Sequence, residues 1–417
     1  MKALHIITGL GVGGAEQQLR LLLRHLPIDC DVVTLTDPGP VADGLAADGV
    51  RVTHLGMTGN RDLAALPRLT RLIRRGRYDL VHTHLYRACL YGRIAARLAG
   101  VRAVVATEHS LGDTQMEGRP LTAGVRGLYL LGERLGRSTV AVSPTVAARL
   151  TRWGVPAPRV TVVPNGIDLA RFAYDPAAGL RAREALGLPA DAFVIGAIGR
   201  LTPGKRFDVL LHCLARLPED CRLLLVGAGP EEPALRRTAR AVGVSDRVVL
   251  AGERPYIADG SPGAPGGPDL PALASAMDVL AAPSAEEAFG LAVVEGLAAG
   301  LPVRYTSCPA LEDLPPEAAP GAVRVPCDAG AYARALAGVR AAGPGPRTAP
   351  EAARHYCITR SAARLMDVYA AALTASHPAP TVEVPVHAPV EVPAQGPAQA
   401  PVPALIHVPV QQRAKSS

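Results

Sequence analysis

Short apolar runs alternate with amphipathic stretches along the first half of the chain. Each run is rich in aliphatic and β-branched residues, a composition that favours strands buried on both faces. The seven runs lie at 2–8, 30–36, 51–55, 79–84, 101–107, 138–143 and 159–164. Between them, apolar residues recur at helical spacing, as over 64–75 and 90–98. Alternating strands and helices predict a parallel, doubly wound α/β sheet.

The same pattern begins again near residue 192. Its apolar runs lie at 193–199, 221–227, 247–252, 278–283 and 301–305. Two successive units of about 170 residues fit the ordinary size of a domain. We therefore predict a first domain over 1–170 and a second over 181–351. The segment 164–180, rich in Pro, Gly and Asp, is the expected linker.

Two segments depart from this pattern. Residues 257–269 read IADGSPGAPGGPD, which predicts a surface loop. From about Ser376 the chain becomes a Pro/Ala/Val repeat with too much proline to pack its apolar residues. We expect residues 376–417 to form a disordered or polyproline-like tail.

Composition indicates a globular protein, with 48% hydrophobic and 19% charged residues among 417. No uninterrupted apolar run is long enough for a membrane-spanning helix, so no membrane span is expected. The start of the chain shows no signal-peptide pattern. The seven cysteines form no C-x-x-C pair, which predicts reduced thiols without zinc or disulfides in a cytoplasmic protein.

The net charge of +7 comes from the first domain, which carries the excess of Arg and Lys. Aromatic residues make up only 4% of the chain and do not interleave with the basic ones, which disfavours nucleic acid as a partner. Segment 67–79, PRLTRLIRRGRYD, holds five arginines, with Leu69, Leu72 and Ile73 on the side expected to be buried. It is either a helix lying on an anionic membrane at the inner face or an ordinary solvated helix.

Gly9, Gly11 and Gly14 spell G-x-G-x-x-G between the first strand and the first helix. This spacing wraps a dinucleotide pyrophosphate around a helix N-terminus. Asp37 closes the next apolar run, near where a ribose-binding acid would sit. The loop alone does not decide between a dinucleotide and another phosphate ligand.

The second half holds two groups of polar residues suited to a sugar diphosphate. In 283–303, Glu287 and Glu295 stand eight residues apart, and a helix beginning near Phe289 would favour an anion at its N-terminus. A carboxylate at each place can accept hydrogen bonds from sugar hydroxyls. In 199–211, Arg200 and Lys205 flank a Pro-Gly turn and can compensate the charge of a diphosphate leaving group without a metal.

Four motifs in order resemble the family 4 retaining, nucleotide-sugar-dependent glycosyltransferases. They are GVGGAE, VPNGID, G-R-L-x-x-x-K and E-A-F-G-L-x-x-x-E, and the similarity spans about residues 1–373. The resemblance implies the GT-B fold, in which two Rossmann-like doubly wound domains face each other across a cleft. It also implies that a terminal helix, about 352–373, crosses back onto the first domain.

The resemblance assigns roles to matching positions of the second domain. Glu295 would bind the nucleotide ribose, and Glu287 would bind hydroxyls of the donor sugar. Arg200 and Lys205 would clamp the diphosphate. The backbone amides of Phe289, Gly290 and Leu291 would contact the sugar or the phosphates.

The resemblance also implies roles for the first domain. Gly13 and Gly14 would bring their backbone against the donor phosphate, and His109 would lie near the donor sugar and the acceptor. A surface histidine after a strand is the alternative for His109. His82 and His84 share one strand face, which favours a structural role or an acceptor contact over a metal pair. The family reaction proceeds with retention and without an essential metal, and no D-x-D motif stands in a plausible loop here.

One loop departs from the family pattern. Arg304, Ser307, Pro309 and Ala310 replace a small apolar residue, an acid and two glycines beside the donor site. The identity of the donor is therefore open. We expect Glu286 to be a solvent-exposed neighbour of Glu287.

These observations predict a glycosyltransferase that moves a hexose or N-acetylhexosamine from a UDP- or GDP-sugar to a hydroxyl. The acceptor would be a glycan, a lipid-linked sugar or a small molecule, in cell-envelope or exopolysaccharide synthesis. No cofactor beyond the donor is expected. Two alternatives remain: a dinucleotide-binding oxidoreductase using the glycine loop, and a non-catalytic scaffold with a transferase-like fold.

Overall fold

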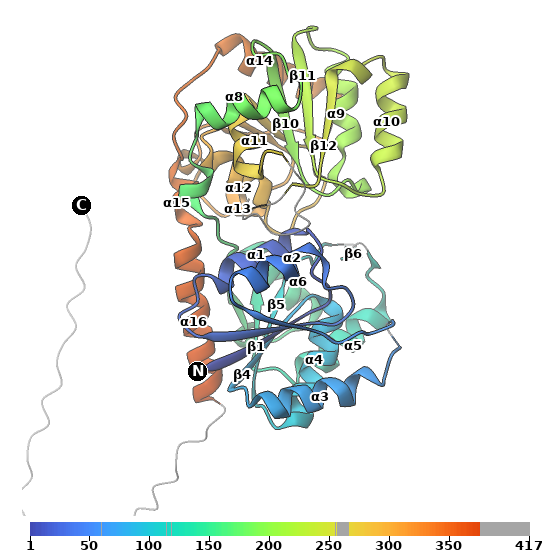
Figure 1. The fold of residues 1–417 in the computed structure, drawn as a ribbon, viewed down its shortest axis with the longest axis vertical. Coiled ribbons are helices and arrows are strands. Elements are labelled where there is room, and N and C mark those ends of the chain that lie inside the picture. The colour runs from blue at the N-terminus through green and yellow to red at the C-terminus, as the bar shows by residue number, and fades with distance from the viewer. Residues whose placement is uncertain (60, 114, 118, 255, 257–266, 376–417) are drawn as a thin grey trace, which may run out of the picture. The chain divides into compact units, whose positions relative to one another are not determined.

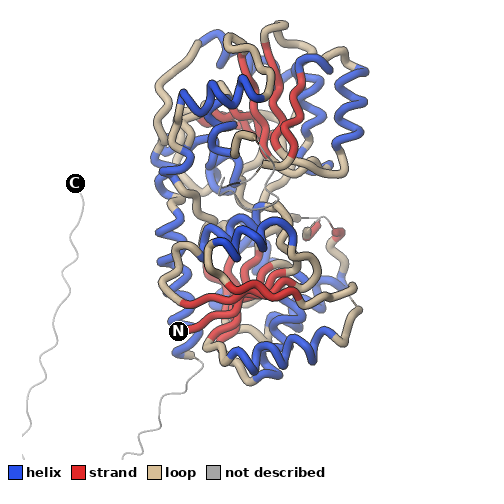
Figure 2. The backbone as a smooth tube through the Cα atoms, in the orientation of Figure 1, coloured by secondary structure: helices blue, strands red, loops and turns tan. Residues whose placement is uncertain are grey.

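The computed structural model of the chain describes residues 1–59, 61–113, 115–117, 119–254, 256 and 267–375. Two parallel sheets, each covered by helices on both faces, make up this part of the chain (Figures 1 and 2). The first sheet has the strand order β3-β2-β1-β4-β5-β8-β9. Its strands are β1 (Lys2–Ile7), β2 (Asp29–Thr34), β3 (Arg51–His54), β4 (Leu80–His84), β5 (Ala103–Glu108), β8 (Ser138–Ala141) and β9 (Val160–Val162).

The second sheet has the order β12-β11-β10-β13-β14-β15. Its strands are β10 (Phe193–Ile198), β11 (Cys221–Val226), β12 (Val248–Gly252), β13 (Val279–Ala282), β14 (Val303–Tyr305) and β15 (Ala322–Arg324). All twelve predicted strands are present. The sequence pattern missed the edge strand β15 and the short antiparallel pair β6 (Gln115–Met116) and β7 (Arg119–Pro120), because such short strands leave no room for a periodic pattern.

Helices connect the strands in both halves. Those before residue 165 are α1 (Gly14–Leu23), α2 (Gly39–Ala47), α3 (Ala65–Gly76), α4 (Tyr86–Ala99), α5 (Ala123–Glu133) and α6 (Pro144–Trp153). Those after it are α7 (Leu169–Phe172), α8 (Pro176–Ala185), α9 (Phe207–Leu214), α10 (Glu232–Ala241), α11 (Leu270–Ala276), α12 (Leu291–Ala298), α13 (Pro309–Glu312), α14 (Ala329–Ala342), α15 (Glu351–His355) and α16 (Ile358–Thr374). Short 3₁₀ turns include η2 (Pro203–Lys205).

Strand β1 explains why the first sheet is buried on both faces. Ala3 and Ile7 belong to the core on one face, and Leu4 and Ile6 belong to the core on the other. Because side chains alternate along a strand, His5 shares the face of Ala3 and Ile7. A polar ring is thereby placed inside an apolar layer.

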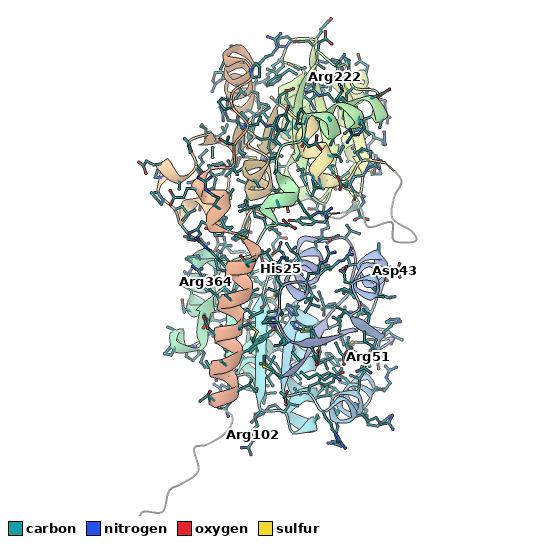
Figure 3. The ribbon with its side chains drawn as sticks, turned by 60° about the vertical axis from the view of Figure 1, so that its left-hand side comes forward. His25, Asp43, Arg51, Arg102, Arg222 and Arg364 are labelled. Carbon is teal, nitrogen blue, oxygen red and sulfur yellow. The ribbon has the colours of Figure 1, made fainter. Side chains whose placement is uncertain are left out.

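Helix α16 covers the face of the first sheet on which His5 lies. Leu365 and Tyr369 of this helix, which runs along the first sheet in Figure 1, are buried in the same core as Ala3 and Ile7 according to their packing. Its outer side carries exposed residues such as Arg364 (Figure 3). The last helical segment of the chain therefore completes the first sheet rather than the second.

The chain passes between the two sheets twice, and the two passages are bonded to each other. Ile167 donates its backbone N–H to Tyr356, and Ile358 donates its own to Ile167. These bonds make a parallel bridge between Ile167 and Cys357. The predicted terminal helix is interrupted here, into α15 and α16.

Three predictions can be compared with the structure only in part. Most of the expected surface loop 257–269 and the tail 376–417 lie outside the described residues. Among the residues that the structure does describe, no helix is both long and apolar enough to cross a membrane.

Candidate functional site

Lys205 and Glu287 form an ion pair at the ends of the central strands of the second sheet. Lys205 ends the turn η2 after β10, and Glu287 lies in the loop that follows β13. The Lys205 Nζ lies 2.5 Å from Glu287 Oε1. Gly199 allows this approach, because its φ is +148° and a Cβ there would lie 3.3 Å from the Lys205 side chain. The pair is partly exposed, so both groups remain accessible to a ligand.

Glu295 lies one turn into α12 and is buried, with 4% of its surface exposed. Burial raises the pKa of Glu295 to about 7, and its interactions with Tyr256 and Lys205 partly offset that rise. Lys205 therefore interacts with both predicted carboxylates. We call Lys205, Glu287 and Glu295 the carboxylate–lysine cluster. Tyr256 was not anticipated, because no motif surrounds it.

The start of α12 differs in detail from the prediction. The helix begins at Leu291, and Gly290 is its N-cap with φ +96°. A Cβ at Gly290 would lie 2.5 Å from Cys308 Sγ, so both the backbone angle and the space require glycine. The Phe289 side chain is buried against Tyr356, with ring centroids 5.0 Å apart. The side chain of Phe289 is therefore part of the core.

The loop that departs from the family pattern is hydrogen-bonded to the residues at the start of α12. Ala310 donates its N–H to the Phe289 carbonyl at 3.0 Å. The Arg304 guanidinium donates to the carbonyls of Val303 and Gly321, toward the neighbouring strand β15. The structure thus gives Pro309 and Ala310 a packing role in α13. It shows no contact between Arg304 and the carboxylate–lysine cluster among the described residues.

The glycine loop of the first domain meets α12 end to end. Gly13 is the N-cap of α1, and a Cβ on Gly14 would lie 3.2 Å from Leu291 Cδ1. The N-termini of α1 and α12 therefore lie against each other, and both favour an anion. The structure brings Gly13 and Gly14 to the predicted residues Gly290 and Leu291, although the two pairs stand in different domains and far apart in sequence.

Glu16 is a neighbour of this helix pair to which we had assigned no role. Its carboxylate lies so close to Gly13 that a Cβ there would collide with it. Burial raises the pKa of Glu16 to about 7, while the positive charge of Arg200 lowers it. Arg200 thus lies near α1 as well as the second sheet. The sequence signal for Glu16 is its position, third after the N-cap, where an acidic side chain can interact with the N-cap residue.

Glu286 is not a solvent-exposed neighbour, so that prediction was wrong. Its carboxylate lies 3.1 Å from Arg149 Nη2 and accepts the backbone N–H of Asp113. Arg149 also donates to the Glu287 carbonyl at 3.2 Å. Ser143 donates to the Ala288 carbonyl at 2.7 Å. The loop that carries Glu287 is therefore held from the first domain, through residues that lie in no recognisable motif.

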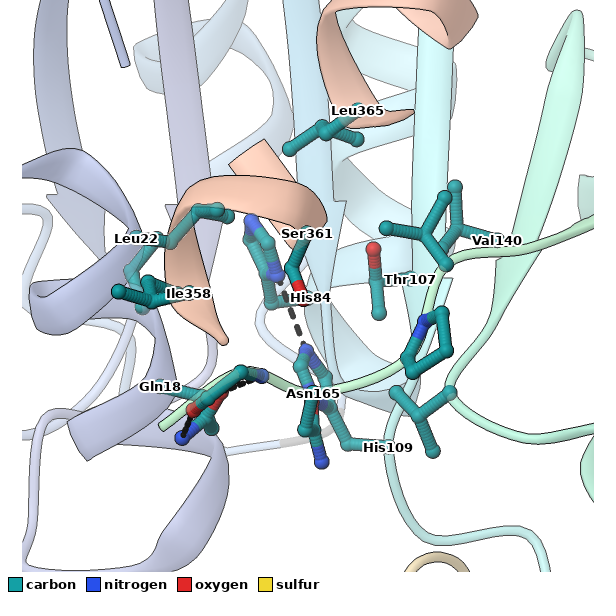
Figure 4. Close-up of a pocket in the computed structure, with 15 residues that line it drawn as sticks. Gln18, Leu22, His84, Thr107, His109, Val140, Asn165, Ile358, Ser361 and Leu365 are labelled. Carbon is teal, nitrogen blue, oxygen red and sulfur yellow. Dashed lines mark hydrogen bonds between the residues drawn. The ribbon is translucent and has the colours of Figure 1, made fainter. Parts of the chain in front are cut away.

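His109 is partly exposed and borders a group of three buried histidines. Its Nε2 lies 3.1 Å from His84 Nδ1 (Figure 4), and His84 Nε2 lies 3.0 Å from His5 Nδ1. Tyr369 Oη lies 3.5 Å from His5 Nε2 and 2.7 Å from His82 Nδ1. The second nitrogen of His82 lies 2.7 Å from Thr107 Oγ1. We call these four histidines, with Tyr369 and Thr107, the histidine network.

Burial keeps the network neutral. It lowers the pKa of His5 to about 3 and that of His109 to about 4, and it lowers the pKa of His82 and His84 far below its ordinary value. Three of the rings could offer nitrogens to a metal, since these lie within 4.8 Å of one another. Each of those nitrogens already has a hydrogen-bond partner, which favours the predicted structural role. His5 escaped notice because it lies on a different strand from His82 and His84, far from them in sequence.

A cavity of about 30 Å³ borders the histidine network. Its walls include His84, Thr107, His109 and Gln18 (Figure 4). His109 Nδ1 is buried and has no hydrogen-bond partner among the described residues. The structure therefore places His109 at the end of the histidine network, in the wall of a largely apolar cavity.

The basic helix α3 borders a groove on the first domain. Leu69 and Ile73 are buried, as predicted, whereas Leu72 is only partly buried and lines the groove. The groove has a volume of about 360 Å³ and is lined by four arginines. These are Arg51, Arg68, Arg71 and Arg75. Asp31 pairs with Arg51, and Asp62 pairs with Arg68. In the part of the chain that the structure describes, no carboxylate pairs with Arg71 or Arg75.

Two family models match the chain, "Glycosyltransferase Family 4" over residues 12–171 and "Glycosyl transferases group 1" over residues 192–340. A D-inositol 3-phosphate glycosyltransferase of Streptosporangium roseum is 31% identical over 405 residues, covering 86% of this chain and 87% of that protein. The one from Salinispora tropica is 33% identical over 72% of this chain, which spans 65% of that relative. Anabaena HepE, solved in complex with UDP and glucose, has a TM-score of 0.75 at 21% identity, covering 89% of this chain and all of that one.

Proposed function

The chain belongs to the glycosyltransferases of family 4, and we propose that it transfers a hexose or N-acetylhexosamine from a UDP- or GDP-sugar to an acceptor hydroxyl. The acceptor would be a glycan, a lipid-linked sugar or a small molecule of cell-envelope or exopolysaccharide synthesis. The observation that carries this proposal is the carboxylate–lysine cluster, with two carboxylates around one cation beside paired helix N-termini.

The cluster suits a sugar diphosphate. In the structure Lys205 is paired with Glu287. A bound diphosphate would share Lys205 and gain Arg200, which lies close enough to α1 to influence Glu16. Glu287 could then accept hydrogen bonds from sugar hydroxyls, and Glu295 from the ribose. The backbone N–H groups at Gly13, Gly14, Gly290 and Leu291 would add two helix N-termini to the phosphate site.

This arrangement also supports departure of the diphosphate without a metal. Lys205 and Arg200 supply positive charge where the leaving group becomes more negative. We propose a retaining, front-face reaction in which the departing phosphate accepts the proton of the attacking hydroxyl. His109 would orient a hydroxyl of the donor or the acceptor.

A thermal-shift panel of UDP, GDP, ADP, NAD and FAD tests the donor class. We expect stabilisation by UDP or GDP and none by NAD or FAD. Stabilisation by NAD alone would favour an oxidoreductase and refute the proposal. A protein that binds UDP or GDP but neither hydrolyses nor transfers any sugar would be a scaffold. The acceptor screen should include inositol phosphates, because two relatives are named for that substrate.

We also propose that α3 holds the enzyme against an anionic membrane. Arg71 and Arg75 lie on its exposed face, beside the groove that Arg51 lines. Each basic residue near an anionic surface contributes about 1 kcal/mol. Sedimentation with vesicles that mix phosphatidylglycerol into phosphatidylcholine should exceed that with pure phosphatidylcholine, and equal sedimentation would exclude this role.

A further inference from the structure

The loop that carries Glu287 is anchored within the second domain at both of its ends. Before Glu287, Ala285 donates its backbone N–H to the Gly204 carbonyl at 3.2 Å. After it, the Phe289 carbonyl accepts the backbone N–H of Ala310 at 3.0 Å. The stretch between these two bonds carries the carboxylate proposed to bind the donor sugar.

Two consecutive carbonyls of this stretch accept hydrogen bonds from the first domain. Arg149 Nη1 donates to the Glu287 carbonyl at 3.2 Å, and Ser143 Oγ donates to the Ala288 carbonyl at 2.7 Å. Both donors belong to α6, because Ser143 is its N-cap and Arg149 lies in its second turn. One helix of the first domain therefore contacts the backbone of the loop at Glu287 itself.

Glu286 adds a charged contact between the same two elements. Its carboxylate lies 3.1 Å from Arg149 Nη2 and also accepts the backbone N–H of Asp113. Gly112 leaves the space for this carboxylate, since a Cβ there would lie 2.6 Å from Glu286 Oε2. The side chains of Arg149 and Glu286 are only 9% and 25% exposed. Because the pair is largely shielded from water, its attraction is stronger than that of an exposed ion pair.

The shape of the arginine side chain suits this arrangement. A guanidinium has five N–H donors in a rigid plane, and Arg149 has five acceptors within reach. Three of these contacts, each 3.1 Å long, lie within the first domain, to the Leu111 carbonyl and to both carboxylate oxygens of Asp113. The other two are those to Glu286 and to the Glu287 carbonyl. The side chain therefore cannot turn away from the loop without losing bonds in its own domain.

We propose that Arg149 is a positioning residue for the donor sugar, which holds Glu287 in place from the opposite domain. This role rests on the proposed function, in which Glu287 accepts hydrogen bonds from sugar hydroxyls. Arg149 contacts the backbone of Glu287, whereas the Glu287 carboxylate pairs with Lys205 and stays available to the sugar. The second domain then binds the nucleotide by itself, and binding of the sugar requires α6 of the first domain.

Kinetics with the full-length Arg149→Met variant test this division. The donor is the sugar nucleotide that the wild-type enzyme hydrolyses fastest in a panel of UDP- and GDP-sugars. We expect kcat/KM for this donor to fall by roughly 10- to 100-fold, as for the loss of hydrogen bonds to a charged group. Affinity for UDP or GDP, which carry no sugar, should not change in calorimetry. Arg149→Lys should resemble Arg149→Met, since an ammonium group cannot contact both domains in the same way.

Arg152→Met is the matched control. Arg152 lies one turn further along α6 and also pairs with Asp113, but it is 68% exposed and this contact lies within the first domain. We expect wild-type kinetics for this variant. Wild-type kinetics for Arg149→Met would overturn the proposal. An equal loss of affinity for the donor and for the nucleoside diphosphate would also overturn it, because that pattern indicates only a damaged fold.

Glu286→Ala tests the same contact from the second domain, at a partly exposed position. We expect a smaller loss of kcat/KM, about 3- to 10-fold, because the bond from Arg149 to the Glu287 carbonyl remains. Glu232→Ala, which removes an ion-paired carboxylate on α10, should match wild type. No loss in Glu286→Ala would count against the proposal.

The contact can also be measured without substrate. The Asp113 amide donates to Glu286, so its hydrogen-exchange rate reports whether the loop is held. We expect faster exchange in Arg149→Met and Glu286→Ala but not in Arg152→Met, and wild-type exchange in Arg149→Met would overturn the proposal. Exchange as expected in a protein that transfers no sugar from any nucleotide would refute the proposed function. Normal transfer by Arg149→Met would instead refute the role of Arg149 alone.

Discussion

The two domains differ in the charge and the burial of the polar side chains that they group together. The carboxylate–lysine cluster of the second domain is charged, and its ion pair remains partly exposed. The histidine network of the first domain is neutral, and three of its four rings, those of His5, His82 and His84, are buried. A charged cluster can bind an ionic ligand, but its ion pair contributes little to the stability of the fold. A neutral, hydrogen-bonded network can support a core, and it can present a donor or acceptor at its edge.

The two clusters respond to pH in opposite directions. The folded-state pKa of Glu295 lies above its ordinary value, so its cost to folding appears as the pH rises from 4.5 to about 7. The folded-state pKa of His109 lies below its ordinary value, so its contribution to folding is complete above 6.5 and is lost as the pH falls to about 4. The following predictions test this contrast, from the largest expected effect to the smallest.

Lys205→Met should have the largest effect on activity. It leaves Glu287 and Glu295 without their cation and removes charge from the phosphate site. We expect kcat/KM for the sugar nucleotide to fall by about 100-fold or more, as for other electrostatic contacts to a leaving group. Arg236→Met removes an exposed, ion-paired cation elsewhere in the domain and should change nothing. Wild-type kinetics for Lys205→Met would remove the cluster from the site.

Glu295→Gln should weaken nucleotide binding and increase the stability of the fold at pH 8. Removing a buried carboxyl whose pKa is raised to about 7 should increase the free energy of unfolding at pH 8 by roughly 3 kcal/mol and leave it unchanged at pH 4. Nucleotide affinity should fall by about 10-fold, measured by calorimetry. Greater stability at both pH values would show that charge is not the cause, and unchanged affinity would remove the ribose assignment.

His109→Asn should flatten the acid limb of the stability curve. Between pH 6.5 and 4 the wild-type protein should lose up to about 1.4 kcal/mol per pH unit through this ring alone, and the variant should lose that much less. Urea unfolding at pH 7, 6 and 5 measures the slope. His212→Asn, at an exposed position, is the control. Identical slopes for wild type and His109→Asn would mean that the ring takes up a proton without penalty.

Arg71→Glu with Arg75→Glu should have the smallest effect on the isolated enzyme. Both residues are exposed on α3, so stability should change by less than about 0.5 kcal/mol. Transfer to a water-soluble acceptor should stay within twofold of wild type, while binding to anionic vesicles should be lost. Retained vesicle binding would place the membrane contact elsewhere.

The sequence predicts those features of the fold and of the site that depend on local spacing. The strands, the parallel sheets and the carboxylate–lysine cluster follow from periodicity and from the order of motifs around Lys205, Glu287 and Glu295. Family matches and structural similarity confirm the fold and the glycosyltransferase assignment. The roles of the individual site residues stay predictions.

The contacts that remained hidden depend on tertiary pairing. His5 lies beside His82 only because β1 pairs with β4, and Tyr369 joins them only because α16 crosses back. Arg149 of the first domain pairs with Glu286 of the second, far away in sequence, and no periodic pattern predicts this contact. Strand β15 has three residues, too few for alternation to register.

The bonded passages at Ile167 and Cys357 restrict how the halves of the chain can move. Two independent connectors would permit twisting as well as bending. Here the connectors share backbone hydrogen bonds, from Ile167 to Tyr356 and from Ile358 to Ile167, so they must bend together. Any rearrangement of one half against the other must therefore carry both connectors along or break these two hydrogen bonds.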